Sequence, residues 1–136
     1  MNPMDEVLDY LKKNPTYYLA TVDAEGNPQV RPFGTITAFE GRLYFQTGNV
    51  KDVFKQIMEH PPIAISATGD GGTSWLRLTA DAVRDDRREA RAAVLADYPD
   101  LQKLYSPDDG NCEVLALEHV TATFCSFASE PRTVEF

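Results

Sequence analysis

The stretch "TYYLATVDAEGNPQVRPFGTITAFEGRLYFQT", from Thr16 to Thr47, decides the fold class of this protein. It is rich in β-branched and aromatic residues, which favour strands. Two turn signals, "DAEGNP" and "EG", divide it into three predicted strands at residues 16–22, 29–39 and 42–47. Short turns between consecutive strands are typical of antiparallel pairing, so we predict an antiparallel meander here.

Helices are predicted on both sides of this meander. Before it, residues 2–13 carry apolar side chains at helical spacing, Asn2 is a suitable N-cap, and Asn14-Pro15 ends the pattern. After it, a second helix follows Asn49 and ends at His60, before two prolines. The core-facing stripe of this second helix is formed by Val50, Val53, Phe54, Ile57 and Met58.

The remaining sequence adds strands and a third helix. Two strands are predicted around "GDGG", a helix at 86–97, and a short helical turn from Leu101 to Leu104. "EVLALEHVTATFCSFAS", from Glu113 to Ser129, predicts a long final strand with a bulge, and "RTVEF" predicts a short one. Roughly six strands with interspersed helices favour a mainly β, α+β fold, a small β-barrel carrying helices. The length of 136 residues predicts a single domain, residues 1–136.

Charge and composition exclude several classes of partner. The formal net charge is −8, and such a surface repels nucleic acid and anionic lipid. The sequence has no apolar run long enough to span a membrane, and its N-terminus lacks the basic and apolar blocks of a signal peptide. We therefore expect a cytoplasmic protein. Cys112 and Cys125 fit no metal-ligand spacing and are expected to be reduced thiols, so no metal site is predicted.

Lys51 has the wrong sign for its position, because it falls in the first turn of the predicted second helix, where the macrodipole is already positive. Lys55 follows one turn later, and Thr47 and Asn49 are good N-cap types. Together with the N–H groups of the helix start, these side chains would form a pocket for a phosphate. The alternative is that Thr47 and Asn49 only cap the helix and that the lysines are solvated.

Arg31 supports the phosphate hypothesis from a second segment. Strand alternation in "QVRPFGTIT" places Arg31 and Phe33 on one face and Pro32 and Gly34 on the other. Pro32 cannot donate a ladder hydrogen bond, so this strand lies at an edge or beside a gap. Gly34 permits something flat to approach the backbone closely. The alternative is a kink at a barrel corner, with Arg31 paired to a surface carboxylate; the spacing favours neither.

Trp75 shares one strand face with Arg77, and Leu76 and Leu78 share the other. If the leucines enter the core, Trp75 faces outward beside an arginine, a combination enriched at protein interfaces. The alternative is a partly covered surface tryptophan. No serine, histidine or acidic residue lies in a nucleophile or acid–base motif, so we assign no catalytic residue.

The order of these segments resembles the pyridoxamine 5′-phosphate oxidase-like family of FMN-binding split barrels. "RPFG" and "YFQTGNVKDV" carry the resemblance when taken together, and it extends from about Tyr17 to Phe127. It implies a split β-barrel of the FMN-binding type. It also implies a homodimer with FMN sites at the subunit interface.

The resemblance assigns the phosphate end of the site to four residues. Arg31 and Lys51 would hold the FMN phosphate, and Thr47 and Asn49 would assist through hydroxyl, amide or backbone groups. A dianionic phosphate would outweigh the unfavourable position of Lys51 at the helix start.

The ring end of the site is assigned in the same way. Pro32, Phe33 and Gly34 would run beside the isoalloxazine ring, and Gln46 would reach the ring or the ribityl chain. Trp75 would come from the partner subunit or line the dimer seam.

The C-terminus departs from the pattern of true pyridoxamine phosphate oxidases, because the chain ends "SEPRTVEF" and its only tryptophan is Trp75. These departures argue against oxidation of vitamin B6 but leave FMN binding in place. We therefore expect an FMN-binding flavoprotein, an oxidoreductase acting on an unidentified small molecule. The alternatives are a non-catalytic protein that binds or senses flavin, deazaflavin or haem, and a dimeric scaffold without a cofactor.

Overall fold

The computed structural model describes the whole chain, Met1 to Phe136, as one eight-stranded sheet with three α-helices. The strands are β1 (Tyr17–Val22), β2 (Pro28–Phe33), β3 (Thr37–Phe39), β4 (Arg42–Gly48), β5 (Pro62–Gly69), β6 (Ser74–Arg84), β7 (Cys112–Ser126) and β8 (Arg132–Glu135). The helices are α1 (Pro3–Lys13), α2 (Asp52–Glu59) and α3 (Arg88–Ala96), with 3-10 turns at Asp70–Gly72 and Pro99–Lys103. This architecture confirms the predicted α+β class. No helix has the length and hydropathy needed to cross a bilayer.

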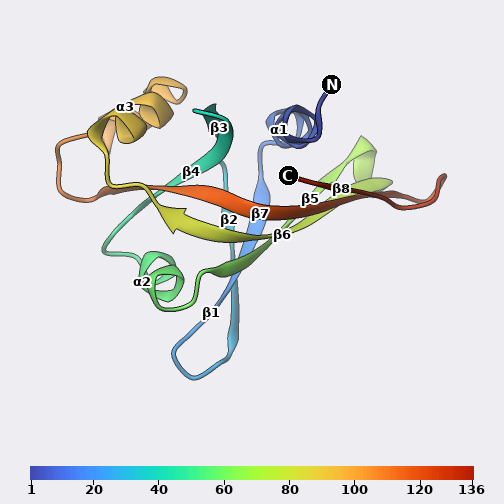
Figure 1. Ribbon diagram of the computed structural model, residues 1–136, viewed down its shortest axis with the longest axis horizontal. Helices are drawn as coiled ribbons and strands as arrows, with labels where there is room; N and C mark the ends of the chain where they lie inside the picture. Colours follow the sequence, from blue (N-terminus) through green and yellow to red (C-terminus); the bar gives the residue numbers. More distant parts are fainter.

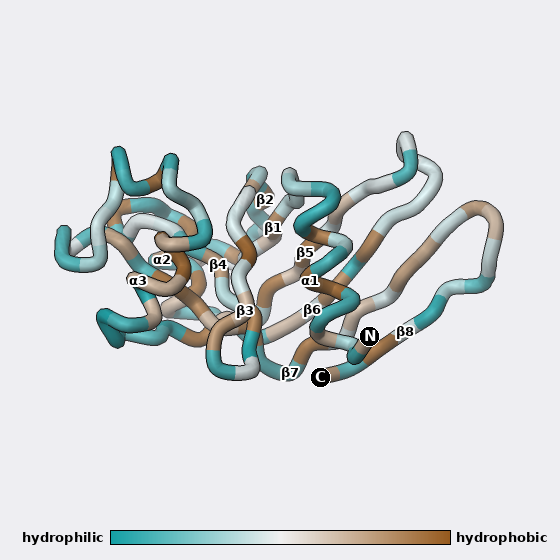
Figure 2. Tube along the Cα trace, turned by 90° about the horizontal axis from the view of Figure 1, so that it is seen from above, coloured by the Kyte–Doolittle hydropathy of each residue, from teal (hydrophilic) through white to brown (hydrophobic).

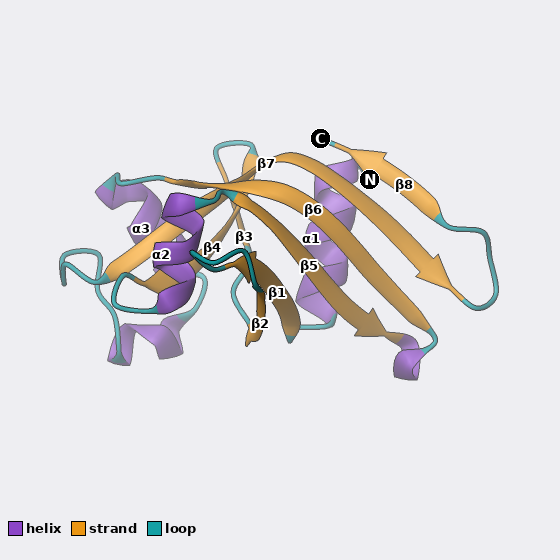
Figure 3. Cartoon of the chain, turned by 90° about the horizontal axis from the view of Figure 1, so that it is seen from below, coloured by secondary structure: helices purple, strands orange, loops and turns teal.

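The sheet is a split barrel in which every paired strand is antiparallel. Its order is β2-β1-β5-β6-β7-β4-β3, and β8 pairs with β7. The long strands β5, β6 and β7 run side by side, with α2 and α3 gathered at one end (Figure 3). In Figure 1, α1 and α3 lie above the long strands and α2 lies below them. Hairpin connections, as predicted, account for the neighbours β1–β2, β3–β4, β5–β6 and β7–β8.

The predicted single strand at 29–39 is wrong, because the structure divides it into β2 and β3. These two strands lie at opposite ends of the strand order, so the chain leaves the sheet at residues 34–36 to cross from one edge to the other. The crossing is held by the Tyr17 hydroxyl, which donates to the Thr35 carbonyl at 2.7 Å. The Thr35 hydroxyl in turn accepts from the Gln46 N–H at 2.9 Å. Pro32 lies in an edge strand, as its missing N–H predicts.

The bulge predicted in the final long strand is confirmed. The β6–β7 register shifts between Thr79 and Asp81, opposite His119, whose φ is +53°. A residue in this left-handed conformation is typical of a bulge that bends its strand. Beyond the bulge β7 changes partner, since β4 pairs with Cys112 to Ala116 and β8 with Thr121 to Phe124.

The core follows the alternation of the strands. β5 alternates strictly between exposed and buried residues, and in β6 Leu76 and Leu78 are buried while Arg77 is exposed, as predicted. A cluster of 20 buried residues fills the barrel, and a smaller one lies between α3 and the sheet. Helix α1 packs Val7 and Leu11 onto the main cluster, and hydrophilic and hydrophobic residues alternate along it in Figure 2. Its predicted cap is present, because Asn2 accepts from the Asp5 N–H at 2.8 Å.

The predicted apolar stripe of α2 is only partly correct. Val53 and Ile57 are buried and Phe54 is half-buried, but Val50 is 71% exposed and Met58 is 41% exposed. The helix begins at Asp52, later than the pattern indicated, so Val50 lies in the preceding turn. The side chains that hold α2 against the barrel are therefore Val53 and Ile57.

The difference in burial between Ile57 and Val50 gives a test of the core. We expect Ile57→Ala to lower the free energy of unfolding by about 2 to 5 kcal/mol, because it leaves a cavity in the barrel. Val50→Ala, in the same segment, should change it by less than about 0.5 kcal/mol. Urea unfolding of both variants measures the two values, and similar losses for the two would contradict the position of α2.

Candidate functional site

A cavity of about 590 Å³ opens where β2 ends and the chain crosses toward β3. Its walls are Arg31 to Thr35, then Gln46 with Lys51 and Val53, and then the segment from Asp97 to Tyr105. The volume is within the range of about 300 to 1,000 Å³ that is usual for small-molecule sites. The fold therefore brings together most of the site residues predicted from the sequence: Arg31, Pro32, Phe33, Gly34, Gln46 and Lys51.

The N-terminus of α2 reaches this cavity without a side-chain cap. Lys51 occupies the N-cap position and caps nothing, and the N–H groups of Asp52 and Val53 make no hydrogen bond within the chain. The free N–H groups and the aligned peptide dipoles make a helix start locally positive. Lys51, whose side chain belongs to the same wall, adds a full positive charge. This corner of the cavity is suited to an anion.

Arg31 and Lys51 are left without a carboxylate partner, although the chain is acidic. Among the arginines only Arg31 and Arg77 form no ion pair, and among the lysines only Lys51 and Lys55. The predicted alternative, in which Arg31 pairs with a surface carboxylate, is therefore wrong for this chain.

Neutral groups hold the Arg31 guanidinium in place. It donates to the Thr21 hydroxyl at 2.8 Å, to the Gln56 side-chain oxygen at 3.0 Å and to the Leu19 carbonyl at 3.2 Å. Partial burial lowers the pKa of Arg31 from its ordinary value, and the charge of Asp52 opposes this effect. Arginine stays protonated nonetheless, so a half-buried and incompletely compensated cation lies beside the helix start.

Thr47 and Asn49 do not cap α2, so that part of the prediction is wrong. Thr47 is buried and its hydroxyl has no hydrogen-bond partner. Asn49 donates its amide to the Gly110 carbonyl at 2.8 Å and to Glu113 at 3.0 Å. Neither residue lines the cavity: Thr47 lies in β4, and Asn49 lies in the turn between Gly48 and Lys51.

Pro32, Phe33 and Gly34 form the wall at the crossing. The Phe33 ring lies against the core, with its centroid 5.5 Å from Phe45 and 6.1 Å from Tyr17, so its ring is committed to packing. At Gly34 an added Cβ would meet only the Pro15 carbonyl, at an ordinary 3.7 Å. Packing within the chain therefore gives no reason for glycine here, and the exposed backbone beside the cavity is left accessible.

Gln46 forms the floor of the cavity beside a buried thiol. Its side-chain amide donates to the Thr47 carbonyl at 2.9 Å and lies 3.9 Å from the Cys112 sulfur. Burial, and after it the charge of Asp109, raises the pKa of the Cys112 thiol to about 11. Cys112 is therefore protonated at neutral pH and acts as an apolar neighbour of the site. Both cysteines are free thiols.

The third wall, from Asp97 to Tyr105, was missed at the level of sequence. Its position depends on Tyr98, whose hydroxyl donates to the Ile36 carbonyl at 3.0 Å and accepts from the Ile36 N–H at 2.9 Å. Asp97 accepts from Lys12 at 2.6 Å and from Thr37 at 2.9 Å. The signal was the pair of tyrosines in "YPDLQKLY", but nothing local connects this segment to the β2–β3 crossing.

Trp75 does not line this cavity. It lies on the outer face of the sheet, beside a hollow of about 530 Å³ that it shares with Tyr18, Val30 and Arg77. Its ring contacts that of Phe127, with the centroids 5.3 Å apart. Tyr18, Val30 and Phe127 are 51%, 68% and 79% exposed, so this outer face is unusually apolar.

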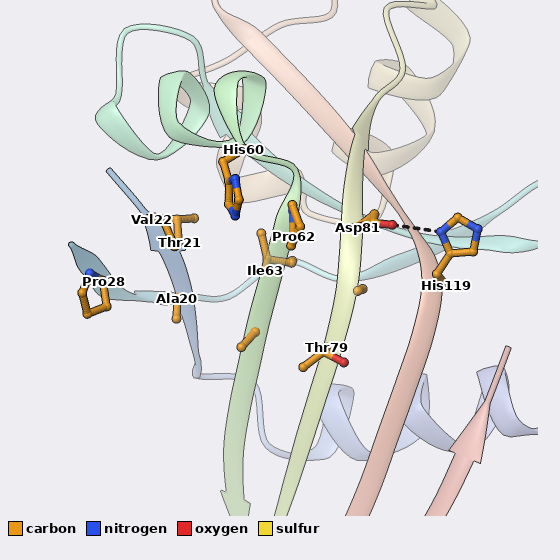
Figure 4. Close-up of a pocket in the computed structure, with 12 residues that line it drawn as sticks. Ala20, Thr21, Val22, Pro28, His60, Pro62, Ile63, Thr79, Asp81 and His119 are labelled. Atoms are coloured by element: carbon orange, nitrogen blue, oxygen red, sulfur yellow. Dashed lines mark hydrogen bonds and ion pairs between the residues drawn. The ribbon is translucent and has the colours of Figure 1, made fainter. Parts of the chain in front are cut away.

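A further hollow of about 400 Å³ adjoins the same outer face and includes both histidines (Figure 4). His60 follows the end of α2, as predicted, whereas His119 extends from the bulge of β7 and pairs with Asp81 at 2.9 Å. Figure 4 shows the two rings on different elements, with β5 and β6 between them. No group of three His, Cys, Asp or Glu side chains is arranged to hold a metal ion.

Known proteins share both the sequence pattern and the fold of this chain. The family model described as pyridoxamine 5′-phosphate oxidase matches residues 3–125. Among solved structures, a NimC/NimA family protein from Clostridium acetobutylicum is 39% identical, with a TM-score of 0.93 over 98% of this chain and 92% of that one. No curated protein sequence matches the chain.

Two more distant structures share the fold alone. HutZ, the haem storage protein from Vibrio cholerae, is 17% identical with a TM-score of 0.66, over 87% of this chain and 90% of that one. An F420 reductase is 20% identical with a TM-score of 0.59, over 81% of this chain and 90% of that one.

The raised pKa of Cys112 gives a test of the cavity floor. Alkylation of this thiol by iodoacetamide should be slow at pH 7 and should accelerate about tenfold per pH unit toward pH 10, because only the thiolate reacts. Mass spectrometry of the Cys112 peptide measures the rate. The same peptide in urea-unfolded protein should react much faster at pH 7, and equal rates in the two states would contradict the buried position.

Proposed function

The chain belongs to the pyridoxamine 5′-phosphate oxidase family, and from this premise we propose that it is an FMN-binding flavoprotein. We propose further that it is an oxidoreductase acting on a small molecule, that residues 1–136 form one domain, and that it works in the cytoplasm. The observation that carries the proposal is the cavity at the β2–β3 crossing with its two unpaired cations.

The corner of the cavity at the start of α2 fits the FMN phosphate. In the proposal, Arg31 and Lys51 neutralise its charge, and the free N–H groups of Asp52 and Val53 donate to its oxygens. The phosphate would also explain why a lysine precedes a helix start that already carries positive charge. Thr47, buried in β4, and Asn49, in the turn before α2, would assist only indirectly, because neither lines the cavity.

The remaining walls fit a flat, partly apolar ring system. Pro32, Phe33 and Gly34 offer exposed backbone beside it, and Gln46 offers an amide at the floor. Tyr98 and Tyr105 close the other side with aromatic surface. A bound flavin supplies hydride or electron transfer, while the chain binds, orients and covers it. No side chain in the cavity is assigned an acid–base role.

A homodimer is the second part of the proposal. Members of this family commonly form dimers, and the outer face around Trp75 is the apolar surface that a second copy would cover. Arg77, on the same face, has no ion-pair partner within the chain and would find one, or an anionic ligand, across the interface. Trp75 would then line the dimer seam or reach the FMN of the other subunit.

A non-catalytic flavin or deazaflavin carrier is the alternative favoured by the variety of proteins that share this fold. Haem fits the cavity less well, because its walls contain no histidine, cysteine or methionine. The candidate axial ligands there are Tyr98 and Tyr105, and the Tyr98 hydroxyl already bonds the Ile36 backbone. Reduction of the bound flavin by a nicotinamide donor, and its reoxidation by a substrate, would distinguish the enzyme from the carrier.

The phosphate assignment is tested by removing both cations. We expect Arg31→Ala with Lys51→Ala to weaken FMN binding by about 100-fold or more, since two charge-assisted contacts are lost. Fluorescence titration of FMN into the apoprotein measures the dissociation constant, and mass spectrometry identifies any ligand released by the wild-type protein. The matched control is Lys13→Ala, which removes an exposed lysine that does not line the cavity. Unchanged FMN affinity in the folded double variant would remove the assignment.

The interface is tested separately at Trp75. Trp75→Ala should weaken dimerisation by about 30-fold, the size expected when a tryptophan anchor is truncated. Analytical ultracentrifugation over a range of protein concentrations measures the dimer constant. The melting temperature should change little at concentrations where both proteins are monomeric. An unaltered dimer constant would count against an interface role for this face.

A further inference from the structure

Glu113 is a buried carboxylate that bonds Arg84 and Asn49, two residues beside the segment that carries Lys51. It lies at the start of β7 with only 4% of its surface exposed. Arg84 of β6 binds it through two nitrogens, at 2.8 and 3.1 Å. Its third bond comes from the Asn49 amide, at 3.0 Å.

The Arg84–Glu113 pair contacts the segment around Lys51 on both sides of that lysine. Before Lys51, Glu113 holds Asn49, which is also fixed by its backbone N–H to the Asn111 carbonyl at 2.9 Å. After Lys51, the Arg84 guanidinium lies 5.7 Å from the centre of the Phe54 ring, in the first turn of α2. Residues 49 and 54, which flank Lys51, therefore both contact one arginine–carboxylate pair, buried at Glu113 and 40% exposed at Arg84.

Stability alone gives little reason for such a pair. Burial removes the hydration of the Glu113 carboxylate, and its pair with Arg84, whose side chain is 40% exposed, offsets that cost rather than adding stability. Anion binding at a helix start, in contrast, needs N–H groups and a lysine fixed in one arrangement before the ligand arrives. The segment from 49 to 54 contains those groups: Lys51 and the free N–H groups of Asp52 and Val53.

We propose that Glu113, through Arg84 and Asn49, is a positioning residue that presents Lys51 and the start of α2 to the phosphate of the bound flavin. This inference rests on the proposed function and deepens it. It also changes the role expected for Asn49, whose amide hydrogens are already donated to Gly110 and Glu113. Asn49 acts by holding the turn, and the phosphate contacts come from Arg31, Lys51 and the helix N–H groups.

The experiment compares FMN with riboflavin, which is the same flavin without the phosphate. We expect Glu113→Gln and Asn49→Ala each to weaken FMN binding by about tenfold, the loss expected when one positioned charge-assisted contact is disturbed. Riboflavin affinity should stay the same in both variants, because the cavity walls at the ring end are untouched. A general loss of structure would weaken the binding of both ligands. The ratio of the two dissociation constants therefore separates an effect on the phosphate site from an effect on the stability of the fold.

Arg88→Gln is the matched control. It removes another two-nitrogen arginine–carboxylate pair, with Asp108, but an exposed one that does not contact the Lys51 segment. Neither ligand's affinity should change in this variant. If Glu113→Gln does not fold, Asn49→Ala decides alone, since it removes the bonds to Glu113 and Gly110 and leaves the Arg84–Glu113 pair in place.

Different outcomes would overturn the positioning role of Glu113 and the phosphate site itself. Equal losses for FMN and riboflavin, or no loss for either in folded Asn49→Ala, would overturn the positioning role while leaving the site in place. If the wild-type protein binds FMN no more tightly than riboflavin, the phosphate site and with it the proposed function fail.

Discussion

The crossing between β2 and β3 is the constraint on which the rest of the structure depends. The two strands are neighbours in sequence but lie at opposite ends of the strand order, so residues 34–36 cannot continue either ladder. Backbone groups freed from pairing need other partners, and here Tyr17 and Tyr98 supply them. The same departure from the sheet leaves the cavity beside Arg31 and opens the barrel where a ligand has room.

Electrostatics then gives the cavity its character. In a chain with 21 acidic and 13 basic residues, most arginines and lysines have a carboxylate within ion-pair distance. Arg31 and Lys51 have none, and Arg31 is held by neutral oxygens that fix its direction without cancelling its charge. Acidic surroundings repel anions in general, so a site of this kind holds one only where cations and helix N–H groups converge. The buried Glu113 adds its negative charge behind the turn, already matched by Arg84.

The family resemblance accounts for the fold, and the particular residues account for the site. The same barrel is found in proteins described by haem storage and by F420 reduction, so the architecture alone does not select a cofactor. The cavity of this chain is lined by two cations without a carboxylate partner, the uncapped start of α2 and two tyrosines. These are features of individual side chains, and they are the basis for proposing FMN.

The sequence by itself determined the α+β class, the hairpins, the edge position of Pro32 and the outward face of Trp75, because alternation and turn chemistry act locally. It also indicated Arg31 and Lys51 as a pair, although only the fold brings them to one cavity. The tertiary structure decided the break after Phe33, the start of α2 at Asp52 and the hydrogen bond from Asn49 to Glu113. It also added Tyr98 and Tyr105, because a wall contributed by residues 97–105 depends on contacts with Lys12 and Ile36 that no local pattern records. Long-range pairing determined these features, and a single sequence carries no direct signal of it.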